Sequence, residues 1–401
     1  EALHALPETA DRTRLELTLQ IMLGAALGAT QGYQAVDHVY ARACELARQV
    51  GSAPELFPAL WGFWYSQLAQ GDIHRSQALA GEFLAQSEQQ DDQLVRAVGH
   101  RMVANTAWWA GELIVAREHS QLGLSLYGAQ SHRAGEVSYG QDSGVCCGWI
   151  GALTTWVLGY PDQAVRTMDE TLARARELAH PFSVAQVLLF SAQLGQLRRE
   201  PHAALEQAEA ALALCAEHGL DAYGTWSLLP RGWARAQLGD VAGGIADIRS
   251  ALEGRLATGT RAVLPRFLAS LGEAYGIAGQ IDQGLDAVEQ AIRTVEENDE
   301  RLYESEAYRI KGELLLLKRV PDFSGADACF RQAIDIALRQ QAKAWELRAA
   351  TSLGRLLRQR GDAIATRSVL APVYGFFTEG FDTADLQDAR ALLEESHPKS
   401  S

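Results

Sequence analysis

The sequence has 401 residues, of which 47% are hydrophobic and 21% charged, and its net charge is −14. This balance is typical of a folded chain with an ample core. An acidic chain without a block of Lys or Arg argues against nucleic acid as the main partner. It has no run of roughly eighteen apolar residues, and its five cysteines lack CxxC spacing, so we expect no membrane span, reduced thiols and a cytoplasmic location.

The N-terminal stretch EALHALPETADRTRLELTL lacks the pattern of a signal peptide and has the composition of a linker that enters a helix. We therefore expect residues 1–12 to be an entry segment and the first helix to begin near Thr13. The same stretch suggests that the chain is a segment of a longer protein.

A repeat of helix pairs is the strongest pattern in the chain. The stretch from Leu268 to Ile292, LASLGEAYGIAGQIDQGLDAVEQAI, has the tetratricopeptide spacing, in which two antiparallel helices meet at a small residue, here Gly272. Equivalent positions recur mostly at steps of forty: Gly24, Trp64, Ala104, Ala152, Ala192, Gly232, Gly272, Gly312 and Gly354. Nine units then cover residues 13–378. Such a period predicts a solenoid.

Each unit of forty residues has room for two helices of about sixteen residues and short turns, longer than the usual unit of about thirty-four. The sequence therefore predicts an all-α solenoid of about nine helix pairs, with at least eighteen helices and no sheet. Gly residues such as Gly239 and Gly279 mark the turns. Trp64 is too large for close helix contact, so its unit is predicted to be more loosely packed or slightly out of register.

Two segments depart from the repeat. Residues 128–143 account for a step of forty-eight and carry His132, Arg133, Tyr139 and Asp142. We expect this segment to be mostly non-helical and to lie at one rim, either as a functional loop or as a plain surface excursion. Residues 379–401 are predicted to form a capping helix, from Thr383 to Glu395, and a frayed tail.

Motifs for catalysis, metal binding and cofactor binding are absent from the sequence. It has no phosphate-binding loop with its Lys, no HExxH, no EF-hand loop and no GxSxG. The adjacent Cys146 and Cys147 point about 100° apart on a helix, so they are better explained as small packing residues than as metal ligands. We predict no catalytic residue, no metal and no cofactor, and hence no enzyme in this segment.

A partner is expected on the concave face, which the first helix of each pair lines. From the helical wheel, its positions lie at −6, −3, +1, +4 and +5 from the small residue. The predicted groove contains Trp61, Tyr65, Arg101, Asn105, Trp108, Trp109, Trp149, Trp156, Gln186, Gln193, Trp226, Trp233, Arg266, Glu273, Glu306, Arg309, Glu313, Arg348, Arg355 and Arg358. Exposed Trp and Arg are frequent binding hot spots. We expect most of these tryptophans to stay partly exposed, although Trp also serves as core between units.

Several stretches also resemble one family. They are AHPFSVAQVLLFSAQ (179–193), PRGWARAQLGD (230–240), ESEAYRIKGELLL (304–316), QQAKAWELRAATSLGRL (340–356) and LAPVYGFFTEGFDTADLQDARALLEE (370–395). Together they resemble the C-terminal tetratricopeptide region of large bacterial signalling proteins. There a class III nucleotidyl cyclase or DNA-binding domain precedes a STAND-type AAA ATPase. The resemblance implies a region that receives a signal and controls the ATPase and output domains, and it supplies no catalytic residue to this chain.

Two functions follow as hypotheses. The first is a non-catalytic interaction and regulatory module that binds a protein or peptide, including other domains of the same polypeptide. The alternative is a small-molecule sensor with a Trp-lined pocket, since aromatic walls suit sugars or planar ligands. The sequence leaves the partner and the oligomeric state open.

Overall fold

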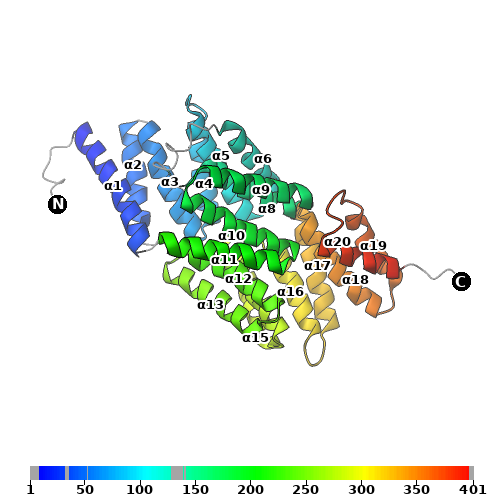
Figure 1. Ribbon diagram of the computed structural model, residues 1–401. Coiled ribbons are helices and arrows are strands. Elements are labelled where there is room, and N and C mark those ends of the chain that lie inside the picture. Colours follow the sequence, from blue (N-terminus) through cyan, green and yellow to red (C-terminus); the bar gives the residue numbers. More distant parts are fainter. Residues whose placement is uncertain (1–8, 32–35, 52, 128–138, 140, 397–401) are drawn as a thin grey trace.

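The computed structural model describes residues 9–31, 36–51, 53–127, 139 and 141–396. In this part of the chain it contains nineteen α-helices and no strand, which confirms the predicted all-α solenoid of nine helix pairs and a capping helix (Figure 1). The pairs are α1 (Ala10–Gln31) and α2 (Asp37–Val50), α3 (Ala53–Gln70) and α4 (Ile73–Ser87), α5 (Gln93–Ala110) and α6 (Leu113–Leu126), α8 (Ser143–Val157) and α9 (Pro161–Glu177), α10 (Pro181–Arg198) and α11 (Pro201–His218), α12 (Asp221–Gln237) and α13 (Val241–Ala257), α14 (Leu264–Ile277) and α15 (Ile281–Asn298), α16 (Glu304–Leu316) and α17 (Phe323–Gln340), and α18 (Lys343–Gln359) and α19 (Ala363–Tyr374). The last helix is α20 (Ala384–Glu395).

Close contact between the helices of a pair depends on the small residues of the repeat, as predicted. A Cβ atom on Gly232 would lie 2.6 Å from the carbonyl oxygen of Gly244 in α13, so here the two backbones touch. A Cβ on Gly272 would collide with Val288, and one on Gly312 with Phe330. Only glycine permits these distances without moving a neighbour.

Trp64 packs between neighbouring helix pairs. It is 1% exposed, and its indole N–H donates to Thr106 Oγ1 of the next pair at 2.8 Å. The large ring therefore fills the space between α3 and α5. The looser packing predicted at this unit is confirmed within the pair, because α3 and α4 have the least extensive close contact of the nine pairs among the described residues.

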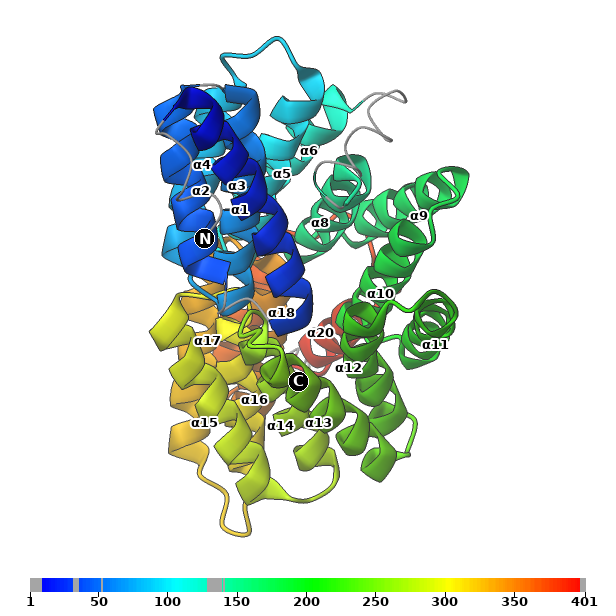
Figure 2. The ribbon, with the colours of Figure 1, turned by 90° about the vertical axis from the view of Figure 1, so that its left-hand side faces the viewer.

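The solenoid winds tightly enough for successive turns of the superhelix to touch. The backbone N–H groups of Arg261 and Ala262, before α14, donate to the carbonyl of Ala69 in α3 at 2.8 and 3.0 Å. One pair further on, Leu302 N–H donates to the carbonyl of Trp109 at 3.2 Å. The second pair thus meets the seventh and the third meets the eighth, where the blue and yellow helices adjoin in Figure 2. We call the turns of the superhelix that touch in this way the docked turns.

The C-terminal segment completes this docking. Glu379 Oε1 accepts from the backbone N–H groups of Asp162 and Gln163, both at 3.0 Å, and so caps the first turn of α9. Helix α20 packs on α18 and α19, and Leu386, Ala389 and Leu392 form its buried face. Its N-cap residue is Thr383, where the helix was predicted to begin. The segment that ends the solenoid therefore also binds an earlier turn of it.

Candidate ligand-binding hollow

A partly open hollow of about 400 Å³ lies inside the superhelix, and we call it the aromatic hollow. Its walls come from the first helices of five successive pairs, from α13 and from the segment that follows α13. The lining residues are Trp64, Tyr65, Leu68, Ala69, Asn105, Trp109, Gln141, Trp149, Gln186, Phe190, Asp221, Ala222, Tyr223, Thr225, Trp226, Gly254, Arg255, Thr258, Thr260, Ala262 and Val263. Two turns of the superhelix thus share one cavity.

Aromatic rings form most of the wall. Trp149 of α8 and Phe190 of α10 stack at 3.6 Å between centroids, with an interplanar angle of 10°. Trp226 of α12 lies 5.4 Å from Phe190 in an edge arrangement and 6.5 Å from Trp109. The guanidinium of Arg255 lies 4.6 Å above the Trp226 ring. Such rigid walls favour flat guests and cation–π contacts.

The polar groups in the wall are oriented by bonds among themselves. Trp109 Nε1 donates to Asn105 Oδ1 at 2.9 Å. The amide nitrogens of Gln141 and Gln186 both donate to the hydroxyl oxygen of Tyr223 at 3.1 Å. Burial raises the pKa of Tyr223 well above its usual value, so the phenol stays neutral. The wall is thus held in one arrangement before any ligand arrives.

The docked turn supplies the remaining side of the hollow. Arg255 Nη2 donates to the carbonyl of Ala262 at 3.1 Å, and Val263 N–H donates to Glu300 Oε2 at 2.8 Å. Burial raises the pKa of Glu300 to about 8. The hydrogen bond from Val263 and the nearby Arg255 lower this pKa, but by less than burial raises it. This buried acid therefore fixes the start of α14, where Val263 has a positive φ of 65°.

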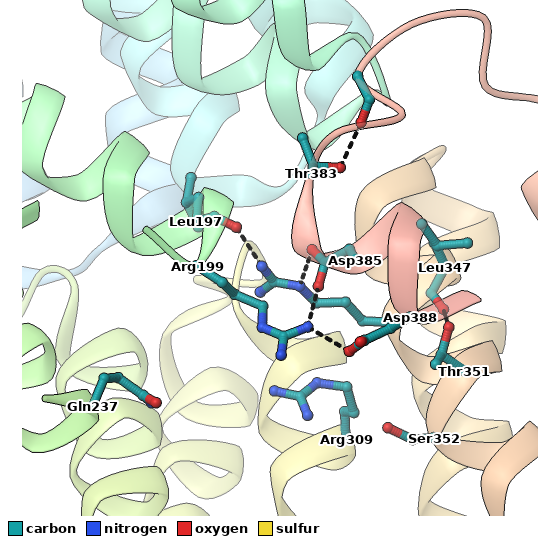
Figure 3. A network of polar contacts seen from close by, with 12 residues as sticks. Leu197, Arg199, Gln237, Arg309, Leu347, Thr351, Ser352, Thr383, Asp385 and Asp388 are labelled. Carbon is teal, nitrogen blue, oxygen red and sulfur yellow. Dashed lines mark hydrogen bonds and ion pairs between the residues drawn. The ribbon is translucent and has the colours of Figure 1, made fainter. Parts of the chain in front are cut away.

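A second space, of about 320 Å³, lies nearer the C-terminus, and we call it the charged hollow. Arg199 Nη1 reaches Asp385 at 3.1 Å and Asp388 at 2.8 Å (Figure 3). Arg348 binds Asp385 at 2.7 Å and also the carbonyl of Leu197. Helix α20 thereby bridges α10 and α18 across this hollow.

Charge in this second space is balanced internally. Arg309 makes a two-point contact with Glu306 at 2.8 and 3.1 Å, and Arg348 reaches the same carboxylate at 3.2 Å. Burial alone would raise the pKa of Glu306, but these two arginines hold it below its usual value. Burial raises the pKa of Glu273, which accepts from Trp233 Nε1 at 3.1 Å. Because each arginine has a carboxylate partner, this hollow offers less unused charge to a ligand than its composition suggests.

The predicted exposure is wrong for most groove tryptophans, whereas Trp61 and Trp226 are partly exposed. Trp108, Trp109, Trp149, Trp156 and Trp233 are at most 4% exposed. The cause is the docking of the turns, which covers the concave face with later parts of the chain. Trp156, for example, lies 5.1 Å from Trp345 of α18 in an edge arrangement.

Several other predicted groove residues are structural as well. Arg101 is buried, with its guanidinium 4.0 Å from the Trp61 ring and Nη1 on the carbonyl of Gln141 at 2.9 Å. Arg266 is also buried, and its Nη1 donates to Gln193 at 2.8 Å. Burial lowers the pKa of Arg266. These cations are held by neutral acceptors and an aromatic face instead of facing an open groove.

The structure divides the other predicted residues between the two hollows. Tyr65, Asn105, Trp109 and Trp149 line the aromatic hollow. Trp233, Arg309, Arg348 and Arg355 line the charged one. Their role in binding a partner stays a prediction. Tyr223, Arg255 and the segment 258–263 also line the aromatic hollow, but the repeat pattern did not predict them. They reach it through the winding of the superhelix, which the repeat does not determine.

The irregular segment 128–143 lies mostly outside the described residues, and so do His132 and Arg133. Its described end contributes to the core. Tyr139 is buried 5.9 Å from the Trp61 ring, and Asp142 caps α8 by accepting from Val145 N–H at 2.7 Å. Whether the rest forms a rim loop stays a prediction.

Side chains for metal or thiol chemistry do not converge in the described part of the chain. No cluster of three or more His, Cys, Asp or Glu there is able to hold a metal ion. Burial raises the pKa of Cys146 to about 11, so its thiol is not a ready nucleophile. Among the described helices, none is both long and apolar enough to cross a membrane.

Comparison with known proteins supports the fold and leaves the family open. No family model matches the chain. An uncharacterised protein of Rhizobium meliloti (strain 1021) is 26% identical over 355 residues. The match covers 85% of this chain and 33% of that protein, so the chain spans about a third of its relative's length.

Solved structures with the same architecture include tetratricopeptide proteins. A chain of the APC/C hetero-tetramer Cut9–Hcn1 matches with a TM-score of 0.55 and 15% identity, over 84% of this chain and 55% of that one. The Rap conjugation gene regulator of plasmid pLS20, in complex with the Phr* peptide, matches with a TM-score of 0.52 and 11% identity, over 85% and 98%. A STAND protein with a tetratricopeptide sensor from Pyrococcus horikoshii gives 0.47, at 14% identity over 94% and 55%.

These comparisons define a tetratricopeptide solenoid as the class of protein. The finer resemblance, to fusions of a nucleotidyl cyclase, an ATPase and repeats, stays a prediction.

Proposed function

We propose that this chain is a non-catalytic regulatory module of a longer protein and that its input is a small ligand held in the aromatic hollow. The observation that carries the proposal is the aromatic lining of this hollow. A space of about 400 Å³ with aromatic walls and a few oriented polar groups has the size and composition of a small-molecule site. A folded protein partner is too large to enter it.

The same geometry suggests how binding would be transmitted. A ligand in the aromatic hollow would touch Tyr65 and Trp109 on one turn of the superhelix and Thr260 and Val263 on the next. Because such a ligand would bind the docked state more tightly than the undocked state, it would shift the chain toward the docked state. Other domains of the same polypeptide would then respond to a more rigid solenoid.

A thermal-shift screen of the isolated chain against metabolites tests this function. Ala222→Trp places a large side chain at the exposed rim of the hollow, and Ala210→Trp makes the same change on the exposed face of α11 as a control. We expect compounds that raise the Tm of the wild type and of the control and lose their effect in Ala222→Trp. Stabilisers that act equally on all three chains would contradict a site in the hollow.

Protein interaction is a second proposed function, and one surface favours it. Helix α1 exposes an apolar stripe on its outer side, with Leu19 43% exposed and Met22 63% exposed. These residues lie five and two positions before the small residue Gly24. The matching positions in later units face the preceding helix pair: Gly99 lies against Leu84 of α4, and Phe190 stacks on Trp149.

We propose that a further helix pair, from the rest of the longer polypeptide, covers this stripe on α1. The stacking of every later pair on its predecessor is the interface that it would continue. A polar face is usual for the terminal unit of a solenoid, and Leu15, Leu19, Met22 and Leu23 are not polar.

Peroxide footprinting tests this surface, because the chain has three methionines and two of them are internal controls. Met102 and Met168 are buried, whereas Met22 is exposed. We expect Met22 to oxidise fastest in the isolated chain and to become protected in the full-length polypeptide. Equal oxidation of Met22 in both would contradict the proposal. If Met22 is protected only at high concentration of the isolated chain, a second copy of the chain and not a further helix pair covers the stripe.

A further inference from the structure

Several acceptor atoms that face the aromatic hollow already accept hydrogen bonds. Asn105 Oδ1 accepts from Trp109, and the hydroxyl oxygen of Tyr223 accepts from two glutamines. The carbonyl of Ala69 accepts from both Arg261 and Ala262. A ligand that brought only hydrogen-bond donors would therefore find few free partners in this wall.

Donors are left over. The indole N–H of Trp226 is buried and has no partner among the described residues. The amide nitrogen of Asn105 is the second donor. An indole N–H can only donate, so Asn105 must turn its oxygen to Trp109 and its NH₂ group away from it. A buried donor without an acceptor costs stability until an acceptor arrives.

The shape and charge of the wall restrict the chemical class of the ligand further. The stacked Trp149 and Phe190, with Trp226 at their edge, form flat apolar walls. Arg255 is a cation in the wall, and the carboxyl group of Glu300 beside it, with a pKa of about 8, is mostly protonated at neutral pH. Asp221 is the acidic residue of the lining and lies exposed at its edge. This environment favours neutral or anionic acceptors over cations.

We infer that the aromatic hollow binds a planar aromatic molecule that presents carbonyl, carboxylate or ring-nitrogen acceptors to Trp226 and Asn105. The inference rests on the proposed function and names the ligand class of the same site.

Three probes separate the requirements of flatness and of acceptors. 2-Naphthoate is planar with a carboxylate, 2-naphthylmethylammonium is planar with donors only, and cyclohexanecarboxylate has the carboxylate without the flat ring. We expect calorimetric titration of the whole chain to show 2-naphthoate binding at least tenfold more tightly than either of the others. Equal or tighter binding of either other probe would overturn the inference.

Two substitutions locate the donors. Asn105→Asp keeps the acceptor for Trp109 but replaces the NH₂ group with oxygen, so we expect it to weaken 2-naphthoate binding at least tenfold. Trp226→Phe keeps an aromatic ring without the N–H and should weaken binding about three- to tenfold. The matched control is Trp233→Phe in the charged hollow, which should leave the affinity unchanged. Unchanged affinity in both test variants would contradict the assignment.

The outcomes distinguish this inference from the proposed function. If no probe binds, or if binding does not depend on Trp226 and Asn105, the ligand class is wrong. The proposed function still stands in that case if compounds from the metabolite screen lose their effect in Ala222→Trp. It fails together with the inference if no compound depends on that position.

Discussion

The guanidinium of Arg199 lies 3.1 Å from the carboxylate of Asp385, which is 186 residues further along the chain. Arg199 is the C-cap residue of α10, and Asp385 lies in the first turn of α20. In a straight stack of helix pairs these residues would be far apart, because each pair contacts only its neighbours. Their contact shows that the superhelix closes on itself, and this closure creates the two hollows.

Asp385 links α20 to two other parts of the chain, since Arg199 and the largely buried Arg348 both bind it. We expect Asp385→Asn to destabilise the chain by about 1–3 kcal/mol, because Arg348 loses a charged partner away from solvent. The more exposed Asp388 serves as control, and Asp388→Asn should cost less than about 1 kcal/mol. Urea unfolding of the three chains measures this, and equal costs would show that α20 is not anchored through Asp385.

Gly232 and Gly354 occupy equivalent positions but differ in what surrounds them. A Cβ on Gly232 would press on the Gly244 carbonyl oxygen, whereas one on Gly354 would meet the Leu392 side chain at 3.0 Å. Backbone cannot yield as a flexible side chain can, so Gly232→Ala should cost about 1–3 kcal/mol and Gly354→Ala at most about 1 kcal/mol. Equal Tm values for the two variants would show that close approach at Gly232 is not required.

Glu300 gives the chain a dependence of stability on pH. Its pKa of about 8 when folded exceeds its ordinary value of 4.5, so the folded state holds a proton that the unfolded state has released between these values. The free energy of unfolding should therefore fall as pH rises from about 5 to 8, by up to about 1.4 kcal/mol per pH unit. Glu300→Gln keeps an acceptor for Val263 and should flatten this slope. The same slope in both chains would contradict the assignment to Glu300.

The tryptophans of the expected groove are now predicted to act as core. Trp108→Ala and Trp156→Ala should each cost about 3–5 kcal/mol, because both rings are buried. Calorimetric melting of each variant measures the cost. A small loss of stability in either would show that the ring is dispensable for packing and would restore the groove hypothesis at that position.

The repeat could be predicted from the sequence because local spacing determines it. The positions of Gly232, Gly272 and Gly312 depend only on which residues let two neighbouring helices touch. Exposure of Trp108 or Trp156 depends instead on how far the solenoid rotates per unit. That small rotation accumulates over several pairs, and no single residue encodes it.

The candidate site was predicted in part for the same reason. Tyr65, Asn105, Trp109 and Trp149 follow from the helical wheel of the first helices. Arg255 and the segment 258–263 enter the aromatic hollow only because a later turn of the superhelix docks beside Ala69. A contact of this kind has no pattern in the sequence, since its backbone hydrogen bonds place no demand on side-chain type.

The most direct test of the central claim is fluorine NMR of the chain labelled with 5-fluorotryptophan. The nine tryptophans give few resonances, and single Trp→Phe changes assign them. A ligand from the metabolite screen that occupies the aromatic hollow should shift Trp226, Trp109 and Trp149 and leave Trp233 in the charged hollow unchanged. Saturating ligand that shifts Trp233 and leaves Trp226 unchanged would contradict the account.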